Sequence, residues 1–261
     1  MLDEDIFRIQ CIGKWPASHV RIEFDNRDFE LPGDLPVRAQ EFWEQRLTKF
    51  PHFFNGALCR LEKYEATPGS LHLHLSRTCY RDLLFCNERV AEILKDFGEE
   101  ALIRALGISV IIETADGFLP LMQRSQTLGE GAGLIDVFGG HVHPDDHARN
   151  GAPDVFLAIA DELHTELNLT PEDFDEIYCA GLLENWQTRK PELIFETKIK
   201  LRFDELREKA RHAKEGEEYI GILSVHESAE EVREALRRDG KSFTPIGHGS
   251  LILLGKLRSW W

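Results

Sequence analysis

Two glutamates near the middle of the chain have a spacing suited to metal chemistry. Glu162 and Glu166 are four residues apart, so on a helix they would share one face. Two carboxylates at this spacing repel each other unless a cation neutralises them. Mg²⁺ takes oxygen ligands and often bridges carboxylates to the phosphates of a substrate. A Glu-x-x-x-Glu pair in general more often belongs to a solvated helix edge, so the surrounding sequence decides between the two interpretations.

The segment around these glutamates predicts a helix that would hold them beside a buried surface. Pro153 and Asp154 suit the first turn of the helix, and Asn168 suits a left-handed cap at its end. One apolar stripe follows helical spacing: Phe156, Ile159, Leu163 and Leu167. The two carboxylates would stand next to this stripe rather than opposite it.

Composition excludes several classes of partner. The chain has 261 residues and a net charge of −15, so its average field repels a phosphate-rich polymer and nucleic acid is not expected. The five cysteines form no Cys-x-x-Cys pair, which argues against a disulfide framework and a cysteine zinc site and fits a reducing compartment. The acidic N-terminus is unlike a signal peptide, and the apolar runs at 108–112 and 251–254 are too short to span a bilayer. We therefore expect a soluble cytoplasmic protein without a membrane partner.

Strands and helices are mixed along the chain, which indicates a layered α/β or α+β architecture. The first region, residues 1–98, has short alternating strands at 20–24 and 71–75, a helix after Pro36 and another at 88–97. The second region, residues 99–261, opens with a short helix at 99–106 and a β-branched run at 108–114. An Ala-Asp-Gly turn follows that run and predicts a hairpin. Later strands are expected at 134–138, 176–183, 193–201 and 219–225, with helices at 204–213, 228–238 and 249–257.

The central segment resembles the Nudix box. In that motif a loop-opening Gly is followed by a helix carrying Arg-Glu-apolar-x-Glu-Glu-x-Gly-apolar. Here Gly140 matches the loop Gly, and Asp161-Glu-Leu-His-Thr-Glu-Leu-Asn-Leu169 matches both glutamate positions and both apolar positions. The chain departs from the motif at Asp161, at Thr165, at Asn168 and in a longer loop without a clear loop Glu.

These departures resemble one branch of the Nudix superfamily, the UDP-glucose pyrophosphatases. Over residues 50–257 the matching motifs are Phe54-Asn-Gly-Ala57, Thr78-Cys-Tyr-Arg-Asp82, Thr114-Ala-Asp-Gly-Phe118, Arg124-Ser125, Gly133-Leu-Ile-Asp-Val-Phe-Gly-Gly-His-Val-His-Pro144 and Asn185. The resemblance implies a Nudix α/β/α sandwich with a mixed sheet over 99–261, preceded by a smaller α+β region over 1–98. It also implies Mg²⁺-dependent hydrolysis of a nucleotide sugar, UDP-glucose or UDP-galactose, to UMP and a sugar 1-phosphate.

The same resemblance implies roles for individual residues. Glu162 and Glu166 would bind Mg²⁺, with Mn²⁺ able to take its place, and Thr165 leaves the number of ions open because the branch carries an acid there. Glu192 is a candidate from its own position, just before a strand, where it could be a further ligand or the general base or could belong to an exposed charged loop. The choice of base between Glu166 and Glu192 stays open. Arg124 follows a strand and could bind phosphate through its planar fork, or form a surface ion pair instead. Tyr80 and Arg81 could meet the nucleotide, by stacking and by charge, or have a structural role between the two regions. The full set of expected substrate-binding residues is Tyr80, Arg81, Asp82, Arg124, Gly139, Gly140 and Asn185.

Three alternatives remain. The substitutions at Asp161 and Thr165 would also suit a nucleotide-sugar-binding module that has lost turnover. A zinc hydrolase could use the histidines that cluster in this part of the sequence: His141, His143, His147 and His164. A Nudix enzyme could act on another nucleoside diphosphate derivative, such as ADP-ribose or a dinucleotide. The sequence leaves the base, the sugar and the oligomeric state open.

Overall fold

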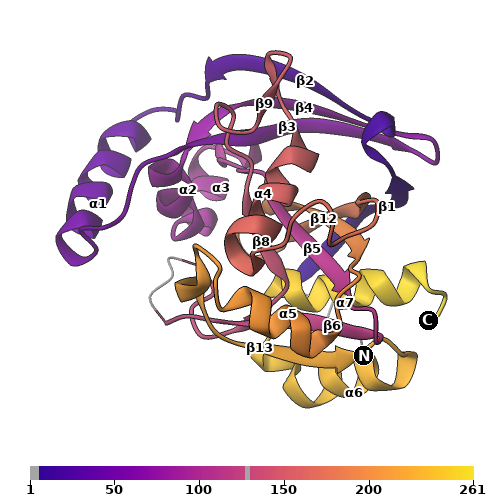
Figure 1. Cartoon of the computed structure of the whole chain (residues 1–261). Helices are drawn as coiled ribbons and strands as arrows, with labels where there is room; N and C mark the ends of the chain where they lie inside the picture. The colour runs from indigo at the N-terminus through magenta and orange to yellow at the C-terminus, as the bar shows by residue number, and fades with distance from the viewer. Residues whose placement is uncertain (1–5, 127–129) are drawn as a thin grey trace.

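A five-stranded mixed sheet forms the centre of the molecule (Figure 1). The computed structural model describes residues 6–126 and 130–261. The sheet has the order β1-β11-β12-β5-β8. Its strands are β1 (Phe7–Trp15), β5 (Gly107–Glu113), β8 (Phe138–His141), β11 (Tyr178–Asn185) and β12 (Lys190–Lys198). The β12–β5 pair is parallel, whereas the other pairs are antiparallel.

Two smaller sheets extend this second half of the chain. A three-stranded sheet has the order β13-β6-β7, with strands β6 (Phe118–Arg124), β7 (Ile135–Asp136) and β13 (Tyr219–His226). Gly117 has a φ of 78° in the turn between β5 and β6, where Thr114 N donates to Phe118 O. The predicted turn therefore forms, since glycine accepts a positive φ without steric cost. The two strands that it joins do not continue as a hairpin, because β5 pairs with β12 and β8 whereas β6 pairs with β13 and β7. The short strands β9 (Ala148–Arg149) and β10 (Ala152–Pro153) pair within the long loop before the central helix.

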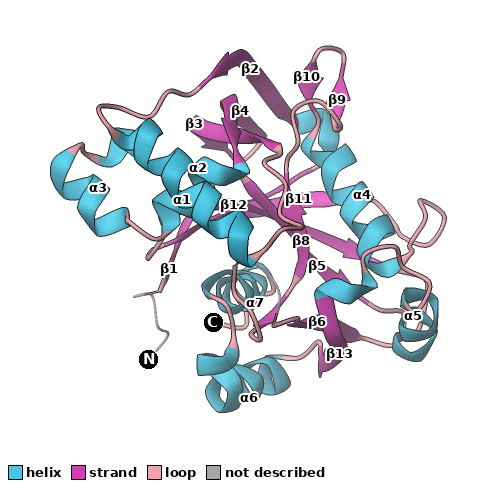
Figure 2. Cartoon of the chain, turned by 90° about the vertical axis from the view of Figure 1, so that its left-hand side faces the viewer, coloured by secondary structure: helices cyan, strands magenta, loops and turns pink. Residues whose placement is uncertain are grey.

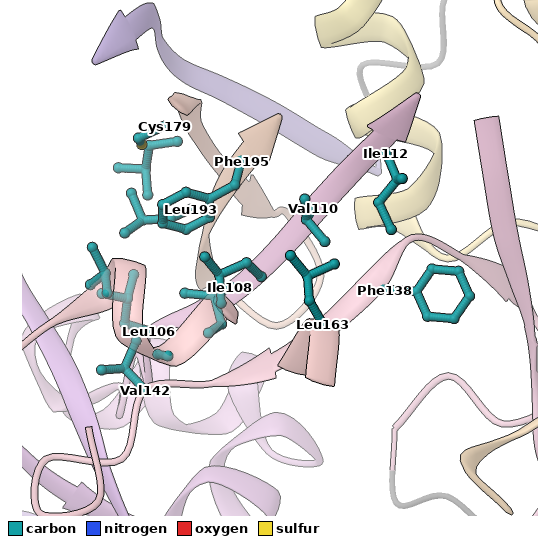
Figure 3. Packing of buried hydrophobic residues seen from close by; sticks show 14 of the residues in the cluster. Leu106, Ile108, Val110, Ile112, Phe138, Val142, Leu163, Cys179, Leu193 and Phe195 are labelled. Carbon is teal, nitrogen blue, oxygen red and sulfur yellow. The ribbon is translucent and has the colours of Figure 1, made fainter. Parts of the chain in front are cut away.

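Helices cover both faces of the central sheet (Figure 2). Helix α4 (Val155–Leu167) packs on β8 and β5, and α7 (Pro245–Leu257) packs on β1 and β11. Side chains of β5 alternate between the two faces: Val110 shares a hydrophobic cluster with Leu163 of α4, whereas Ile111 shares one with Leu251 of α7. Figure 3 shows Val110, Ile112, Phe138 and Leu163 together on the α4 side. This arrangement confirms the expected α/β/α sandwich with a mixed sheet.

Two further helices lie at the margins of this region. Helix α5 (Phe203–Ala210) contacts α4, and α6 (Ala229–Asp239) contacts β13. The side chain of Ser228 accepts a hydrogen bond from Glu231 N at the start of α6, as the sequence predicts.

The N-terminal part has its own sheet and helices. The sheet has the order β2-β4-β3, formed by β2 (Val20–Asp28), β3 (Ala57–Thr67) and β4 (Ser70–Cys79), and the helices are α1 (Leu35–Lys49), α2 (Tyr80–Asn87) and α3 (Val90–Asp96). Strand β1 nevertheless pairs with β11, and Leu106 N donates to Cys59 O at 2.7 Å. The boundary between residues 98 and 99 stays a prediction. Backbone hydrogen bonds connect the two regions, both in the β1–β11 pair and between Leu106 and Cys59.

The expected helix at 99–106 is wrong. Only a 3-10 turn, Glu99–Ala101, forms there. The following backbone hydrogen-bonds to β3 instead, since Ala105 forms a bridge with Arg60 and Arg104 has a φ of 45°. Further 3-10 turns span Ala17–His19, Gly216–Glu218 and Gly240–Ser242. All five cysteines are free. No helix within residues 6–126 and 130–261 is long and apolar enough to cross a bilayer.

Candidate active site

Helix α4 begins and ends where the sequence predicts, and this fixes the position of the glutamates. The Asp154 carboxylate accepts hydrogen bonds from Phe156 N at 2.9 Å and Leu157 N at 3.1 Å. Asn168 ends the helix in the left-handed conformation, with φ of 56°. The buried stripe then sets the rotation of the helix about its axis, so that Glu162 and Glu166 face the two glycines of strand β8, Gly139 and Gly140.

Glu166 is a fully buried acid, with 0% of its surface exposed. Its Oε2 accepts a hydrogen bond from Gly139 N at 2.9 Å, and its Oε1 has no hydrogen-bond partner among the described residues. Burial raises the pKa of this carboxyl well above its ordinary value, and the neighbouring carboxylates of Glu162 and Glu218 add to that rise. A buried acid without a counter-charge is costly in the folded protein. A cation bound beside it would remove that cost.

Glu162 lies against the same glycine pair of β8, at Gly140. A Cβ atom on Gly140 would come within 2.1 Å of Glu162 Oε1, so a glycine is required for the carboxylate to approach the backbone. Gly139 is equally constrained, because its φ is 151° and a Cβ there would lie 2.0 Å from Ile108 O. The pKa of Glu162 is raised to about 8. Burial is the largest cause, and the negative charges of Glu215 and Glu218 raise it further.

Two further acids at this site have no counterpart in the sequence prediction. Glu215 and Glu218 come from the 3-10 segment before β13, and both line the same cavity as Glu162. Backbone hydrogen bonds hold the segment, from Glu215 N to Thr165 O at 2.8 Å and from Ser125 N to Glu218 O at 2.8 Å. These acids lie about fifty residues beyond the box in a charged stretch without a motif, so no signal in the sequence marked them.

The two substituted box positions point elsewhere. Thr165 is buried, and its hydroxyl donates to Asp161 O within the helix at 3.0 Å. The Asp161 side chain is 56% exposed and lies 3.5 Å from His147 Nε2. Neither residue lines the cavity. Thr165 stands where the motif has a glutamate. Glu215 and Glu218 nevertheless supply further carboxylates to the site.

Glu192 enters the site from β12. Its Oε1 accepts a hydrogen bond from Ser109 Oγ at 2.8 Å, while Oε2 has no hydrogen-bond partner within the described part of the chain. The carboxylate packs on Gly107, where a Cβ would lie 1.9 Å from Oε2. Burial raises the pKa of Glu192, against the opposing charge of Lys190 and the hydrogen bond from Ser109.

Two cations face these acids. Lys190 Nζ lies 3.5 Å from Glu192 Oε2 and 3.6 Å from Glu130 Oε2. Burial opposes the charge of Lys190, but the two carboxylates outweigh it and raise the pKa of the ammonium group. Arg124 Nη1 lies 3.5 Å from Asp136 Oδ2, at the end of β6. Lys190 was not expected at the site, because Arg189-Lys-Pro reads as an exposed loop in the sequence.

A cavity of about 380 Å³ brings most of these groups together. Of the residues expected from the sequence, it is lined by Tyr80, Arg124, Gly139, Gly140, Glu162, Asn185 and Glu192. Glu166 lies behind Gly139 rather than on the cavity surface. Asn185 also accepts hydrogen bonds from Gln187 N and Thr188 N, so part of its role is to shape the turn after β11.

Arg81 and Asp82 are not at the cavity. Arg81 Nε donates to Asp82 Oδ1 at 2.6 Å, and its Nη1 donates to Gln40 of α1 at 3.0 Å. The reason is that these residues start α2, a helix that the sequence analysis did not predict, and α2 packs on α1. The structure therefore gives this pair a local environment between helices, separate from the other expected site residues.

The histidines do not converge on one point. His143 N donates to His147 Nδ1 at 3.1 Å, while His164 Nδ1 lies 3.2 Å from Leu169 O. Burial lowers the pKa of His141 well below its ordinary value. Across the described ranges, no group of three or more His, Cys, Asp or Glu side chains is already arranged to hold a metal ion.

Three features are together typical of Nudix hydrolases: the sandwich fold, the helix with the Glu-x-x-x-Glu pair, and the Gly139-Gly140 pair of β8 that the glutamates face. No family model matches the chain. Curated relatives do: the bovine (Bos taurus) protein named "Uridine diphosphate glucose pyrophosphatase NUDT22" is 30% identical over 208 residues, which cover 68% of this chain and 70% of that protein. The human (Homo sapiens) protein of the same name is 30% identical over 206 residues, covering 68% of this chain and 67% of its own length.

Solved structures give weaker likenesses. A MutT protein from Methanosarcina mazei is 18% identical, with a TM-score of 0.36, and the match covers 59% of this chain and 94% of that one. The putative Nudix hydrolase Tm1382 is 14% identical, with a TM-score of 0.40, over 82% of this chain and 96% of that one. On the sequence relatives, the chain belongs to the family of NUDT22-type pyrophosphatases and is a Nudix pyrophosphohydrolase.

Proposed function

We propose that this enzyme hydrolyses the pyrophosphate bond of a UDP-sugar, UDP-glucose or UDP-galactose, to UMP and a sugar 1-phosphate with Mg²⁺ as cofactor. The observation that carries the proposal is the buried carboxylate of Glu166, whose Oε1 has no hydrogen-bond partner in the described chain. It lies directly behind a cavity lined by Arg124 and Lys190. The name shared by the curated relatives supports the choice of UDP-glucose. The cavity of about 380 Å³ falls within the range of small-molecule sites.

The acidic residues fit a divalent cation. Glu166 Oε1 is buried without a hydrogen-bond partner in the described chain. Burial is the largest cause of the raised pKa values of Glu162, Glu166 and Glu218, and neighbouring carboxylates add to each rise. Hard cations such as Mg²⁺ or Mn²⁺ take carboxylate oxygens. We assign Glu162 and Glu166 as ligands, with Glu218 as the additional acid. When bound, the ion would neutralise pyrophosphate charge and lower the pKa of a water molecule.

The cations would orient the substrate. Arg124 offers a planar fork of N–H donors that suits phosphate oxygens, and Lys190 offers a point charge. In the structure both are balanced by acids, Asp136 for Arg124 and the Glu130–Glu192 pair for Lys190. Both cationic residues line the cavity, where a diphosphate would compete with the acids for them. Gly139 and Gly140 of β8 line the cavity, and the missing side chain of Gly140 lets the Glu162 carboxylate lie against the strand.

We assign Glu192 as the group that accepts the proton from the attacking water. One of its oxygens accepts a hydrogen bond from Ser109, and the other has no hydrogen-bond partner in the described chain and lies 3.5 Å from Lys190 Nζ, so the carboxylate is oriented from both sides. Glu166 is less suited, since it lies behind Gly139 and accepts a hydrogen bond from Gly139 N. Glu192→Gln should lower kcat roughly 10²- to 10⁴-fold with little change in KM, as expected when a general base is lost. An unchanged kcat would return the role to Glu166.

The experiment that tests the proposal is a substrate comparison with the purified enzyme. Release of the two monophosphate products would be measured for each substrate: UMP and sugar 1-phosphate from UDP-glucose and UDP-galactose, AMP and ribose 5-phosphate from ADP-ribose, and nucleoside monophosphates from a dinucleotide. Each reaction would be run with Mg²⁺, with Mn²⁺ and with chelator. We expect the highest kcat/KM for one of the UDP-sugars and loss of turnover in chelator. A preference for ADP-ribose would support the hydrolase activity but contradict the UDP-sugar substrate. Full turnover in chelator would contradict the metal requirement.

A further inference from the structure

One aromatic side chain at the cavity is left almost entirely uncovered. Phe54 lines the cavity, and at 80% exposure it is the most exposed large hydrophobic side chain in the described part of the chain. An exposed phenylalanine loses the free energy that burial of its ring would provide. A single exposed apolar residue needs no explanation by itself, but this one lies at the mouth of the active site.

The backbone on both sides of Phe54 is firmly held. The ring of Phe53 stacks on Phe50 with centroids 5.0 Å apart. Asn55 Oδ1 accepts a hydrogen bond from Arg81 N at 2.7 Å, and Gly56 O accepts one from Tyr80 N at 3.0 Å. The exposure of Phe54 therefore does not come from a loosely attached loop. Its two neighbours are anchored to α1 and α2 while its own ring stays in solvent.

The surroundings of Phe54 are aromatic, in contrast to the acidic and basic residues lining the rest of the cavity. Gly56 lies beside it: a Cβ there would contact both Phe54 Cε1 at 3.4 Å and His143 Cε1 at 3.7 Å. Tyr80 and His141 also line the cavity, with ring centroids 6.5 Å apart. Tyr80 was the aromatic residue expected to stack on the substrate, but its ring already contacts those of Trp43 and Phe53. Phe54 is the ring that offers an open face.

A cavity with aromatic and charged lining matches the two chemical parts of a nucleoside diphosphate. The phosphates need cations and metal, and the base has flat faces that stack on aromatic side chains. We propose that Phe54 stacks on the nucleobase of the substrate and thereby positions the nucleotide half in the cavity. This inference rests on the proposed nucleotide substrate. Because every base has a π-face, the contact would contribute affinity without selecting uracil over other bases.

The test separates the base from the rest of the nucleotide. Binding of UMP, AMP and ribose 5-phosphate would be measured by calorimetry with wild type, Phe54→Ala, Phe54→Tyr and, as an exposed control on α1, Val37→Ala. Val37 is 63% exposed and does not line the cavity. We expect Phe54→Ala to weaken UMP and AMP by roughly 5- to 100-fold, the range for loss of one base–aromatic stack, and to leave ribose 5-phosphate unchanged. Phe54→Tyr and Val37→Ala should bind like wild type.

Kinetics give a second readout. With UDP-glucose, Phe54→Ala should raise KM by a similar factor and leave kcat near the wild-type value, since the contact lies away from the reacting phosphorus. Equal weakening of UMP and ribose 5-phosphate, no weakening of either nucleotide, or no binding of UMP and AMP by wild type would overturn the proposal. If UMP binds but UDP-glucose is not hydrolysed, the proposed function fails while the binding comparison still tests Phe54.

Discussion

At the scale of single residues, the site concentrates negative charge that the folded protein alone does not compensate. Burial is the largest cause of the raised pKa of Glu162, Glu166 and Glu218, and a neighbouring carboxylate adds to the rise in each case: Glu215 for Glu162 and Glu218, and Glu162 for Glu166. Replacing one acid of such a group by its neutral amide removes both the repulsion and the cost of burying a charge. The same acids that would hold a metal therefore destabilise the protein when metal is removed.

This predicts a pH-dependent stability difference between metal-free wild type and Glu162→Gln. The pKa of Glu162 rises from its ordinary 4.5 in the unfolded chain to about 8 in the fold. The folded state therefore holds the proton more tightly, and the wild type loses stability relative to the variant as pH rises from about 4.5 through about 8. Since solvent reaches part of this carboxyl, we expect a difference of roughly 1–3 kcal/mol at pH 8 and almost none near pH 4.

Urea unfolding in chelator at several pH values would measure this difference. Glu208→Gln is the matched control, because Glu208 of α5 is an exposed acid that pairs with Arg211 at the surface. Its difference from wild type should not vary with pH in the same way. A Glu162→Gln protein that is no more stable than wild type at pH 8 would contradict the assignment of a destabilising charge.

At the scale of elements, α4 depends on its ends. The Asp154 side chain accepts two backbone N–H groups of the first turn and lies 3.1 Å from Arg149 Nε. We expect Asp154→Ala to lower the free energy of unfolding by about 0.5–2 kcal/mol, whereas Asp154→Asn, which can still cap, should lower it less. Urea denaturation of the three proteins would measure this. Equal losses in both variants would indicate that the charge pair with Arg149 matters more than the cap.

The ends and the buried face of α4 could be predicted from sequence because they depend on local rules. Asp154, Asn168 and the apolar stripe each act through backbone geometry within one helix. The helix expected at 99–106 failed because its backbone hydrogen-bonds to β3, a partner some forty residues earlier in the chain. Local pattern does not contain that information.

The candidate site divides in the same way. Glu162, Glu166 and the Gly139-Gly140 pair lie in one contiguous motif, so their spacing along the chain predicted that they belong to one site. Lys190, Glu218 and Phe54 reach the cavity only through the pairing of distant strands and loops. In the opposite direction, Arg81 and Asp82 belong to a matching motif, and yet α2 turns them toward α1.

At the scale of the whole molecule, β1 ties the two regions together. Phe7 and Trp15, at the two ends of β1, are each 1% exposed, and Trp15 Nε1 donates to Thr67 O in β3. Phe7 also packs beside α7, where a Cβ on Gly249 would lie 2.9 Å from its ring. Residues 99–261 alone would lack the edge strand of the central sheet and part of the α7 contact.

We therefore predict that a fragment of residues 99–261 does not fold cooperatively, even though it contains the complete box. In the full chain, Trp15→Ala should lower the free energy of unfolding by about 3–5 kcal/mol, the usual range for truncating a buried aromatic residue. Circular dichroism and urea unfolding would test both proteins. A fragment with a single cooperative transition and a stability near that of the full chain would instead establish residues 99–261 as an independent domain.

The measurement that tests the account most directly is turnover of UDP-glucose by Glu166→Gln. UMP release would be followed with Mg²⁺ for wild type, Glu166→Gln and the surface control Glu208→Gln, with circular dichroism to verify folding. Losing a metal ligand removes several kcal/mol of charge stabilisation, so we predict at least about a 100-fold loss of kcat in Glu166→Gln and none in the control. A folded Glu166→Gln enzyme with wild-type turnover would contradict the assignment of this carboxylate to the reaction.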